Sequence, residues 1–134
     1  MHIKNLIIIL VLITSLKLDQ QGEDITGKWV VDAVDVKMPG LNPKEKEALK
    51  QQFVQPFTNA VFDFKPDHHV TLSAHLRGMP KPDSWEYDAV KRLITIREQS
   101  KGAIMKIHVT EERGVTFFSL AETPAILKVH KKLD

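Results

Sequence analysis

The feature that most constrains the fold of this chain is a two-residue alternation of apolar and polar side chains, which recurs along most of its length. The clearest stretch is residues 70–77, whose apolar positions are Val70, Leu72, Ala74 and Leu76. Successive side chains of a β-strand point to opposite faces, so this period is typical of a strand with one buried and one solvated face. We therefore expect a chain built mainly from half-buried strands.

Eight segments show this pattern, and polar connections, several of which contain Gly or Pro, separate them. They are residues 28–38, 59–65, 70–77, 85–87, 93–97, 103–110, 115–120 and 125–132. From the second segment on they recur about every 8 to 12 residues, which indicates an antiparallel sandwich or barrel. Strands and helices do not alternate, so a parallel sheet is not expected. In the first segment, the alternation predicts a face formed by Trp29, Val31 and Ala33.

One segment departs from the strand pattern and predicts a helix. The residues from Asn42 to Glu45 combine a favoured N-cap, a proline at the first helical position and a glutamate three residues after the cap. From there we expect an amphipathic helix over residues 43–55 that ends at Pro56. Its apolar stripe consists of Leu49, Phe53 and Phe57. We expect this helix to lie over the open end of a sheet barrel, because its stripe must cover something apolar.

The N-terminal residues are typical of a secretory signal peptide. Lys4 precedes the apolar run of residues 6–13, and charged and polar residues follow from Lys17. As a helix, residues 6–16 would rise roughly 16 Å, about half the hydrocarbon thickness of a bilayer. We therefore predict a signal peptide over residues 1–18 and a single domain over residues 22–134, with no stable membrane span after signal removal. An uncleaved N-terminal anchor and a core strand are the alternatives for the apolar run.

The amino-acid composition limits both the compartment in which we expect the protein and the kinds of site that it can form. The chain has 134 residues, with 19 Lys plus Arg against 17 Asp plus Glu, and no cysteine. A net charge of +2 spread evenly along the chain does not fit a nucleic-acid-binding protein. Without cysteine, a disulfide, a thiolate metal site and a lipid-modified cysteine are all excluded. We expect a periplasmic or secreted protein that is not lipid-anchored.

The entry to the first strand carries a family resemblance. Residues 25–29, Ile-Thr-Gly-Lys-Trp, resemble the Gly-x-Trp signature of the lipocalin and fatty-acid-binding protein superfamily, and the order of parts resembles small bacterial lipocalin-like domains. The resemblance implies an eight-stranded, antiparallel, up-and-down β-barrel with one helix between the first and second strands. It also implies that Trp29 plugs one end of the barrel beneath a basic side chain of the last strand. The structural signature would consist of Gly27, Trp29 and Lys128, with Lys131 and Lys132 as alternatives to Lys128.

The interior of such a barrel is the expected binding site. Eight-stranded barrels are either filled by side chains or hold one small ligand. For a small hydrophobic or amphipathic ligand in the lumen or at its mouth, the candidate contacts are Phe53, Phe57, Phe62, Phe64, Leu72, Trp85, Tyr87 and Met105. The alternative is an envelope protein-interaction module or inhibitor with a closed, filled barrel. Neither reading implies a cofactor.

Catalytic and metal-binding groups are sparse. Asp67, His68 and His69, followed by His75, are the only cluster of metal-ligand types, and the position of the first three after Pro66 favours a solvated turn over a metal site. No serine stands in a nucleophile motif, and the chain has no phosphate-binding glycine loop. We therefore expect a protein that is not an enzyme and binds no metal.

Overall fold

The computed structural model describes residues 25–74 and 78–133, which form eight strands and one helix. Their bounds are β1 (Gly27–Val36), α2 (Pro43–Phe57), β2 (Val61–Phe64), β3 (Val70–Leu72), β4 (Pro82–Asp88), β5 (Leu93–Glu98), β6 (Ala103–Glu112), β7 (Val115–Leu120) and β8 (Ala125–Lys131). The predicted signal peptide, residues 1–18, lies outside the described residues.

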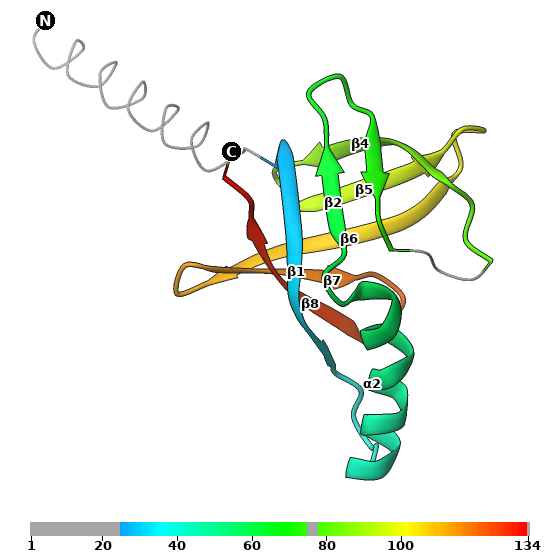
Figure 1. Ribbon diagram of the computed structural model, residues 1–134, viewed down its shortest axis with the longest axis vertical. Coiled ribbons are helices and arrows are strands. Elements are labelled where there is room, and N and C mark those ends of the chain that lie inside the picture. Colours follow the sequence, from blue (N-terminus) through cyan, green and yellow to red (C-terminus); the bar gives the residue numbers. More distant parts are fainter. Residues whose placement is uncertain (1–24, 75–77, 134) are drawn as a thin grey trace, which may run out of the picture.

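The described strands form one antiparallel sheet that curls into a nearly closed barrel (Figure 1). The strand order is β3-β2-β1-β8-β7-β6-β5-β4, so the first and last strands of the sequence are neighbours inside the sheet. Their pairing runs the length of β8. The predicted eight-stranded antiparallel barrel, with one helix between the first and second strands, is confirmed.

A seam between β3 and β4 interrupts the barrel, because these two strands share no continuous ladder. An isolated bridge pairs His69 with Ser84. The Trp85 amide donates a hydrogen bond to the His68 carbonyl at 2.9 Å, and the Trp85 indole Nε1 donates to the Lys65 carbonyl at 3.0 Å. These contacts all lie at the β2–β3 turn, so the two edges are held together at one end of the seam.

β3 is shorter than the alternation predicts, and a serine hydroxyl explains where it ends. The Ser73 amide donates to the Val61 carbonyl at 3.0 Å, but the Val61 amide donates to Ser73 Oγ at 2.8 Å instead of to a backbone carbonyl. A side chain that takes over a ladder bond competes with regular strand pairing. The remainder of the predicted strand includes residues 75–77, which lie outside the described residues.

A β-bulge at Asp32 corrects the predicted face of β1. The register of β1 against β8 shifts at this position, where Asp32 stands opposite no residue of β8. Because the extra residue moves the alternation by one position, Val34 and Val36 turn into the barrel and Ala33 turns outward. The prediction that Ala33 shares a face with Trp29 is therefore wrong.

The helix α2 begins where the sequence predicts and ends two residues later. Asn42 Oδ1 accepts a hydrogen bond from the Glu45 amide at 2.8 Å, which confirms the predicted N-cap. Pro56 lacks an N–H and was expected to end the helix. However, the Thr58 amide donates to the Val54 carbonyl at 2.9 Å, so helical bonding resumes beyond the proline.

Only the last turns of α2 meet the core, and the rest of the helix projects beyond the barrel (Figure 1). Phe57 is fully buried and stacks on Phe62, with ring centroids 6.3 Å apart. Phe53 and Val54 are half-buried against the same core. The expected cover over the end of the barrel is thus limited to the C-terminal part of the helix. Within the described residues, no helix has the length and apolar character to cross a bilayer.

Aromatic rings in mutual contact form a cluster inside the barrel. The Phe118 ring centroid lies 5.5 Å from that of Trp29, 5.5 Å from that of Phe62 and 6.4 Å from that of Phe64. Phe64 in turn contacts Trp85, with centroids 5.2 Å apart. These separations fall within the range of favourable aromatic pairs. The aromatic side chains thus form one packed cluster that spans the barrel.

Candidate functional site

The candidate site lies on the outer face of four neighbouring strands, β6, β7, β8 and β1. Strand register sets which outward side chains stand side by side. One row is Ala33, Lys128, Phe117 and Thr110, and the next is Asp35, Ile126 and Ser119. Directly opposed side chains on one face of a sheet have Cβ atoms about 4.5–5.5 Å apart. The two rows therefore form one continuous surface.

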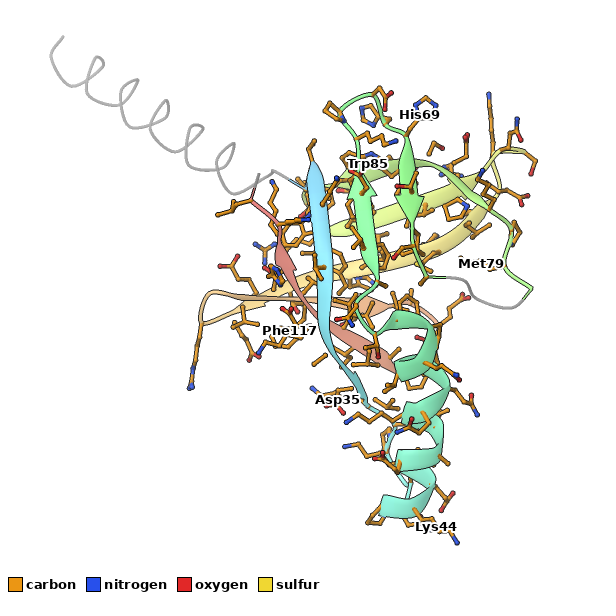
Figure 2. The ribbon with its side chains drawn as sticks, in the orientation of Figure 1. Asp35, Lys44, His69, Met79, Trp85 and Phe117 are labelled. Atoms are coloured by element: carbon orange, nitrogen blue, oxygen red, sulfur yellow. The ribbon has the colours of Figure 1, made fainter. Side chains whose placement is uncertain are left out.

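This surface is hollowed, and we call the hollow the outer trough. It encloses about 680 Å³, a volume within the usual range for small-molecule sites. Its lining residues are Ala33, Asp35, Lys37, Thr110, Glu112, Phe117, Ser119, Ile126 and Lys128. Figure 2 shows Asp35 and Phe117 beside the half of β1 that leads to α2, away from Trp85. The bulge at Asp32 increases the local twist of β1 where this strand flanks the trough.

The lining combines an apolar base with charged flanks. The middle strands β7 and β8 supply the half-buried side chains of Phe117 and Ile126, together with the ammonium of Lys128. The flanking strands β1 and β6 supply the carboxylates of Asp35 and Glu112. A mainly apolar surface with a few polar groups that fix orientation is typical of a binding site for an organic molecule.

A second hollow extends the trough toward the β6–β7 hairpin. It encloses about 380 Å³ and shares Glu112, Phe117 and Lys128 with the first. Its other lining residues are Arg113 and Val115. Because three residues line both hollows, the two form one elongated depression along the outer face.

The charges of the trough are not paired with one another. Across residues 25–74 and 78–133, no ion pair involves Lys37, Glu112 or Lys128. Asp35 Oδ1 accepts a hydrogen bond from the adjacent Val36 amide at 2.8 Å. A ligand would therefore not have to break an internal salt bridge to reach these groups.

The residues predicted to line a ligand-filled lumen belong to the packed interior. Four of them are buried, namely Phe57, Phe62, Phe64 and Trp85. The other four are half-buried and pack against the same core, namely Phe53, Leu72, Tyr87 and Met105. None of these eight lines the outer trough or its extension, and Met105 lies on a separate hollow of about 220 Å³ beside β6. Binding in the lumen stays a prediction.

A lysine of β8 lies over the ring of Trp29 in the Gly-x-Trp segment. Lys131 Nζ lies 5.9 Å from the ring centroid of Trp29, and the indole Nε1 donates to the Ile25 carbonyl at 2.7 Å. Of the three candidate lysines, Lys131 is therefore the one that lies over the ring, whereas Lys128 points outward into the trough. The alternation of β8 carries the signal for this choice, since Lys131 follows the buried Val129 by two residues.

The Asp67–His69 cluster forms a turn whose members face different partners. The Asp67 carboxylate accepts a hydrogen bond from the His69 amide through Oδ1 at 3.0 Å, and its Oδ2 lies 3.1 Å from His69 Nδ1. The His69 amide, and then its side chain, hold the pKa of the Asp67 carboxyl below its usual range. The His68 ring packs against Trp85 instead, with centroids 5.3 Å apart. In the described part of the chain, no three His, Asp or Glu side chains gather as metal ligands would.

Sequence reasoning missed the outer trough, although part of its signal was present. Phe117 and Ile126 are apolar residues on the outward parity of β7 and β8, where polar residues are the rule. Outward apolar residues in neighbouring strands can indicate an external contact surface. The register that makes them neighbours and the curvature that hollows the surface are properties of the assembled sheet.

Protein-family models, curated proteins and solved structures were each compared with the chain, and none of them matches it. The lipocalin resemblance remains a prediction carried by the Gly-x-Trp signature and the order of the parts, whereas the barrel is seen directly in the structure.

Proposed function

We propose that the protein binds a small amphipathic molecule in the outer trough rather than in the lumen. One contrast carries this proposal. The aromatic cluster packs the interior at the predicted ligand residues, whereas a hollow of about 680 Å³ lies on the outer face. The trough combines exposed apolar area with charged groups that form no ion pair within the described chain.

The energetics of such a site follow from its lining. An alkyl or ring system laid over Phe117 and Ile126 would remove apolar surface from water, at about 25 cal/mol for each Å² buried. The charged groups on the flanking strands and Lys128 would then fix the orientation of the polar end. A site of this kind binds reversibly and needs neither a nucleophile nor a cofactor. We propose a non-catalytic binding protein that acts after export, in the periplasm or outside the cell.

The direct test is a titration of octanoate into the ¹⁵N-labelled protein, followed by backbone NMR. We expect chemical-shift changes at Phe117, Ser119 and Ile126, and none at the interior residues Phe62 and Ile94. The variant Phe117→Asp should weaken binding by about tenfold or more, because it places a charge on the apolar base. The matched control is Val61→Asp, an outward position of β2 that does not line the trough.

Two outcomes would contradict the proposal. Shift changes confined to the barrel interior would return the ligand to the lumen. No shift change with any amphiphile would remove the binding function altogether. Spectra of the free variants show whether each one is folded, so that a loss of binding is not confused with a loss of structure.

A protein-interaction module is the second candidate, and one observation favours it. The first turn of α2 carries Lys44, Glu45, Lys46 and Glu47, all of them exposed, and Lys44 lies at the end of the helix that projects from the barrel (Figure 2). A photoreactive group placed at Lys44 should then cross-link one protein in cells, whereas the same group in the β4–β5 turn at Lys91 should capture none. Equal capture from both positions would argue against a specific helix contact.

A further inference from the structure

We infer that the outer trough takes an amphiphile with a singly charged anionic head group, and that Lys128 is the residue that binds this group. This inference rests on the proposed function and adds the charge of the ligand to it. It is argued from the neighbours of Lys128 in the sheet, from the acidic residues around it and from the apolar base beside it.

The residues paired with Lys128 across the sheet, and those that share its face along β8, carry no negative charge. In its own row, Lys128 lies between Ala33 of β1 and Phe117 of β7. Along β8, the residues that share its face are Ile126 and His130. Lys128 thus presents an ammonium among two aliphatic side chains, one aromatic ring and one imidazole.

The nearby carboxylates are engaged elsewhere or displaced from Lys128. Asp32 contacts His130 Nδ1 at 2.8 Å through its Oδ1. Asp35 stands opposite Ile126 rather than Lys128, and its side chain accepts a hydrogen bond from the Val36 amide. Glu112 lies on β6 opposite Val115, one row away from Lys128 and two strands across. None of them forms an ion pair with Lys128 in the described chain.

The position of Lys128 in the trough favours one head-group charge over others for two reasons. A carboxylate, sulfonate or similar anion beside Lys128 gains a charge-assisted hydrogen bond, while its hydrocarbon covers Phe117 and Ile126. Lys37 also lines the trough, so the trough's two cations balance the carboxylates of Asp35 and Glu112, and a single bound negative charge already exceeds that balance. A head group with one negative charge therefore fits better than a neutral or multiply charged one.

The test compares three probes with the same eight-carbon chain, namely octanoate, octyl glucoside and octyltrimethylammonium. We expect octanoate to bind the protein most tightly and octyltrimethylammonium most weakly. Lys128→Met keeps much of the aliphatic stem and should weaken octanoate binding about 2- to 5-fold, since an ion pair at an exposed lysine contributes modestly, and should leave octyl glucoside binding unchanged. Lys128→Arg should retain octanoate binding. The control is Lys28→Met, an exposed outward lysine of β1 outside the trough.

The outcomes separate this inference from the function on which it rests. If octyl glucoside binds the trough as tightly as octanoate, or Lys128→Met binds both as the parent does, the charge assignment is wrong and the binding function stands. If no probe perturbs the trough, both fail. A lipid bilayer is a second source of anionic head groups, so cosedimentation with phosphatidylglycerol vesicles is measured in parallel. Sedimentation that depends on Lys128 would overturn the assignment to a free amphiphile.

Discussion

The Lys131 side chain lies where a side chain at position 27 would otherwise be, so the two positions are coupled. Gly27 has a φ of +128°, and a Cβ built there would stand 2.7 Å from Lys131 Cε. The Lys131 side chain passes over this glycine to place its ammonium near the Trp29 ring. A cation over a tryptophan face contributes about 0.5–2 kcal/mol, depending on how far both groups are desolvated. The glycine thus allows both a rare backbone conformation and the approach of the cation.

The variant Gly27→Ala should lower the free energy of unfolding by about 1–3 kcal/mol, because it strains the backbone and displaces Lys131. The matched control is Gly40→Ala, whose φ of +87° is also unfavourable but whose added Cβ would meet no atom within 4 Å. Urea denaturation of both variants measures the difference. Equal losses would show that the contact with Lys131 contributes nothing beyond backbone strain.

At the scale of the element, β1 shows how one unpaired residue changes a whole strand. Before the bulge, Trp29 and Val31 point inward, and after it Val34 and Val36 do so. A strict alternation through this strand would have left the last two valines on the outside. Because of the bulge, the strand buries four apolar side chains, although no single two-residue alternation in its sequence would place all four on one face.

The bulge makes a paired prediction about adjacent positions. Val34→Lys should destabilise the protein by about 3 kcal/mol or more, since it brings a charge into the barrel. Ala33→Lys should change stability by no more than about 0.5 kcal/mol, because its side chain is exposed. Thermal or chemical unfolding of the two variants is the measurement. A larger loss for Ala33→Lys would mean that the uninterrupted alternation describes the strand in solution.

Elements were predicted from the sequence better than their faces and ends. All eight strands and the N-cap at Asn42 follow from local patterns, because alternation and capping are decided by residues a few positions apart. The bulge at Asp32 and the end of β3 at Ser73 depend on what the neighbouring strand offers. Such features arise from pairing partners distant in the sequence, so no local pattern indicates them.

At the scale of the whole molecule, one ring of β7 links core residues of two other strands. Phe118 of β7 contacts the rings of Trp29, Phe62 and Phe64, which come from β1 and β2. Its neighbour Phe117 points the other way, into the outer trough. Adjacent phenylalanines in one strand therefore serve different parts of the molecule.

This division predicts unequal effects of the same substitution. Phe118→Ala should cost about 3–5 kcal/mol of stability, as expected for a fully buried phenylalanine in a packed core. Phe117→Ala should cost about 1 kcal/mol, because its ring is only half-buried. Urea denaturation is again the measurement. Similar losses for the two variants would argue against the packing of the rings around Phe118.

The site was less predictable than the fold for a reason that concerns the whole molecule. Sequence patterns identify which residues are apolar, and so predicted a large inward set that includes Phe62 and Phe64. They do not indicate whether these side chains meet across the barrel or leave room between them. The outer trough depends further on sheet curvature, which is set by twist, register and the bulge together.

The seam lies between two strands that follow one another in the sequence. Each strand of the sheet is bonded to its sequence neighbour except at one step, from β3 to β4, and the sheet is instead completed by β1 and β8. The ends of these two strands lie together, with Trp29 opposite Lys131. A circular permutant that joined these ends and opened between β3 and β4 would lay down all eight strands in the order in which they pair, as an unbroken meander from one sheet edge to the other.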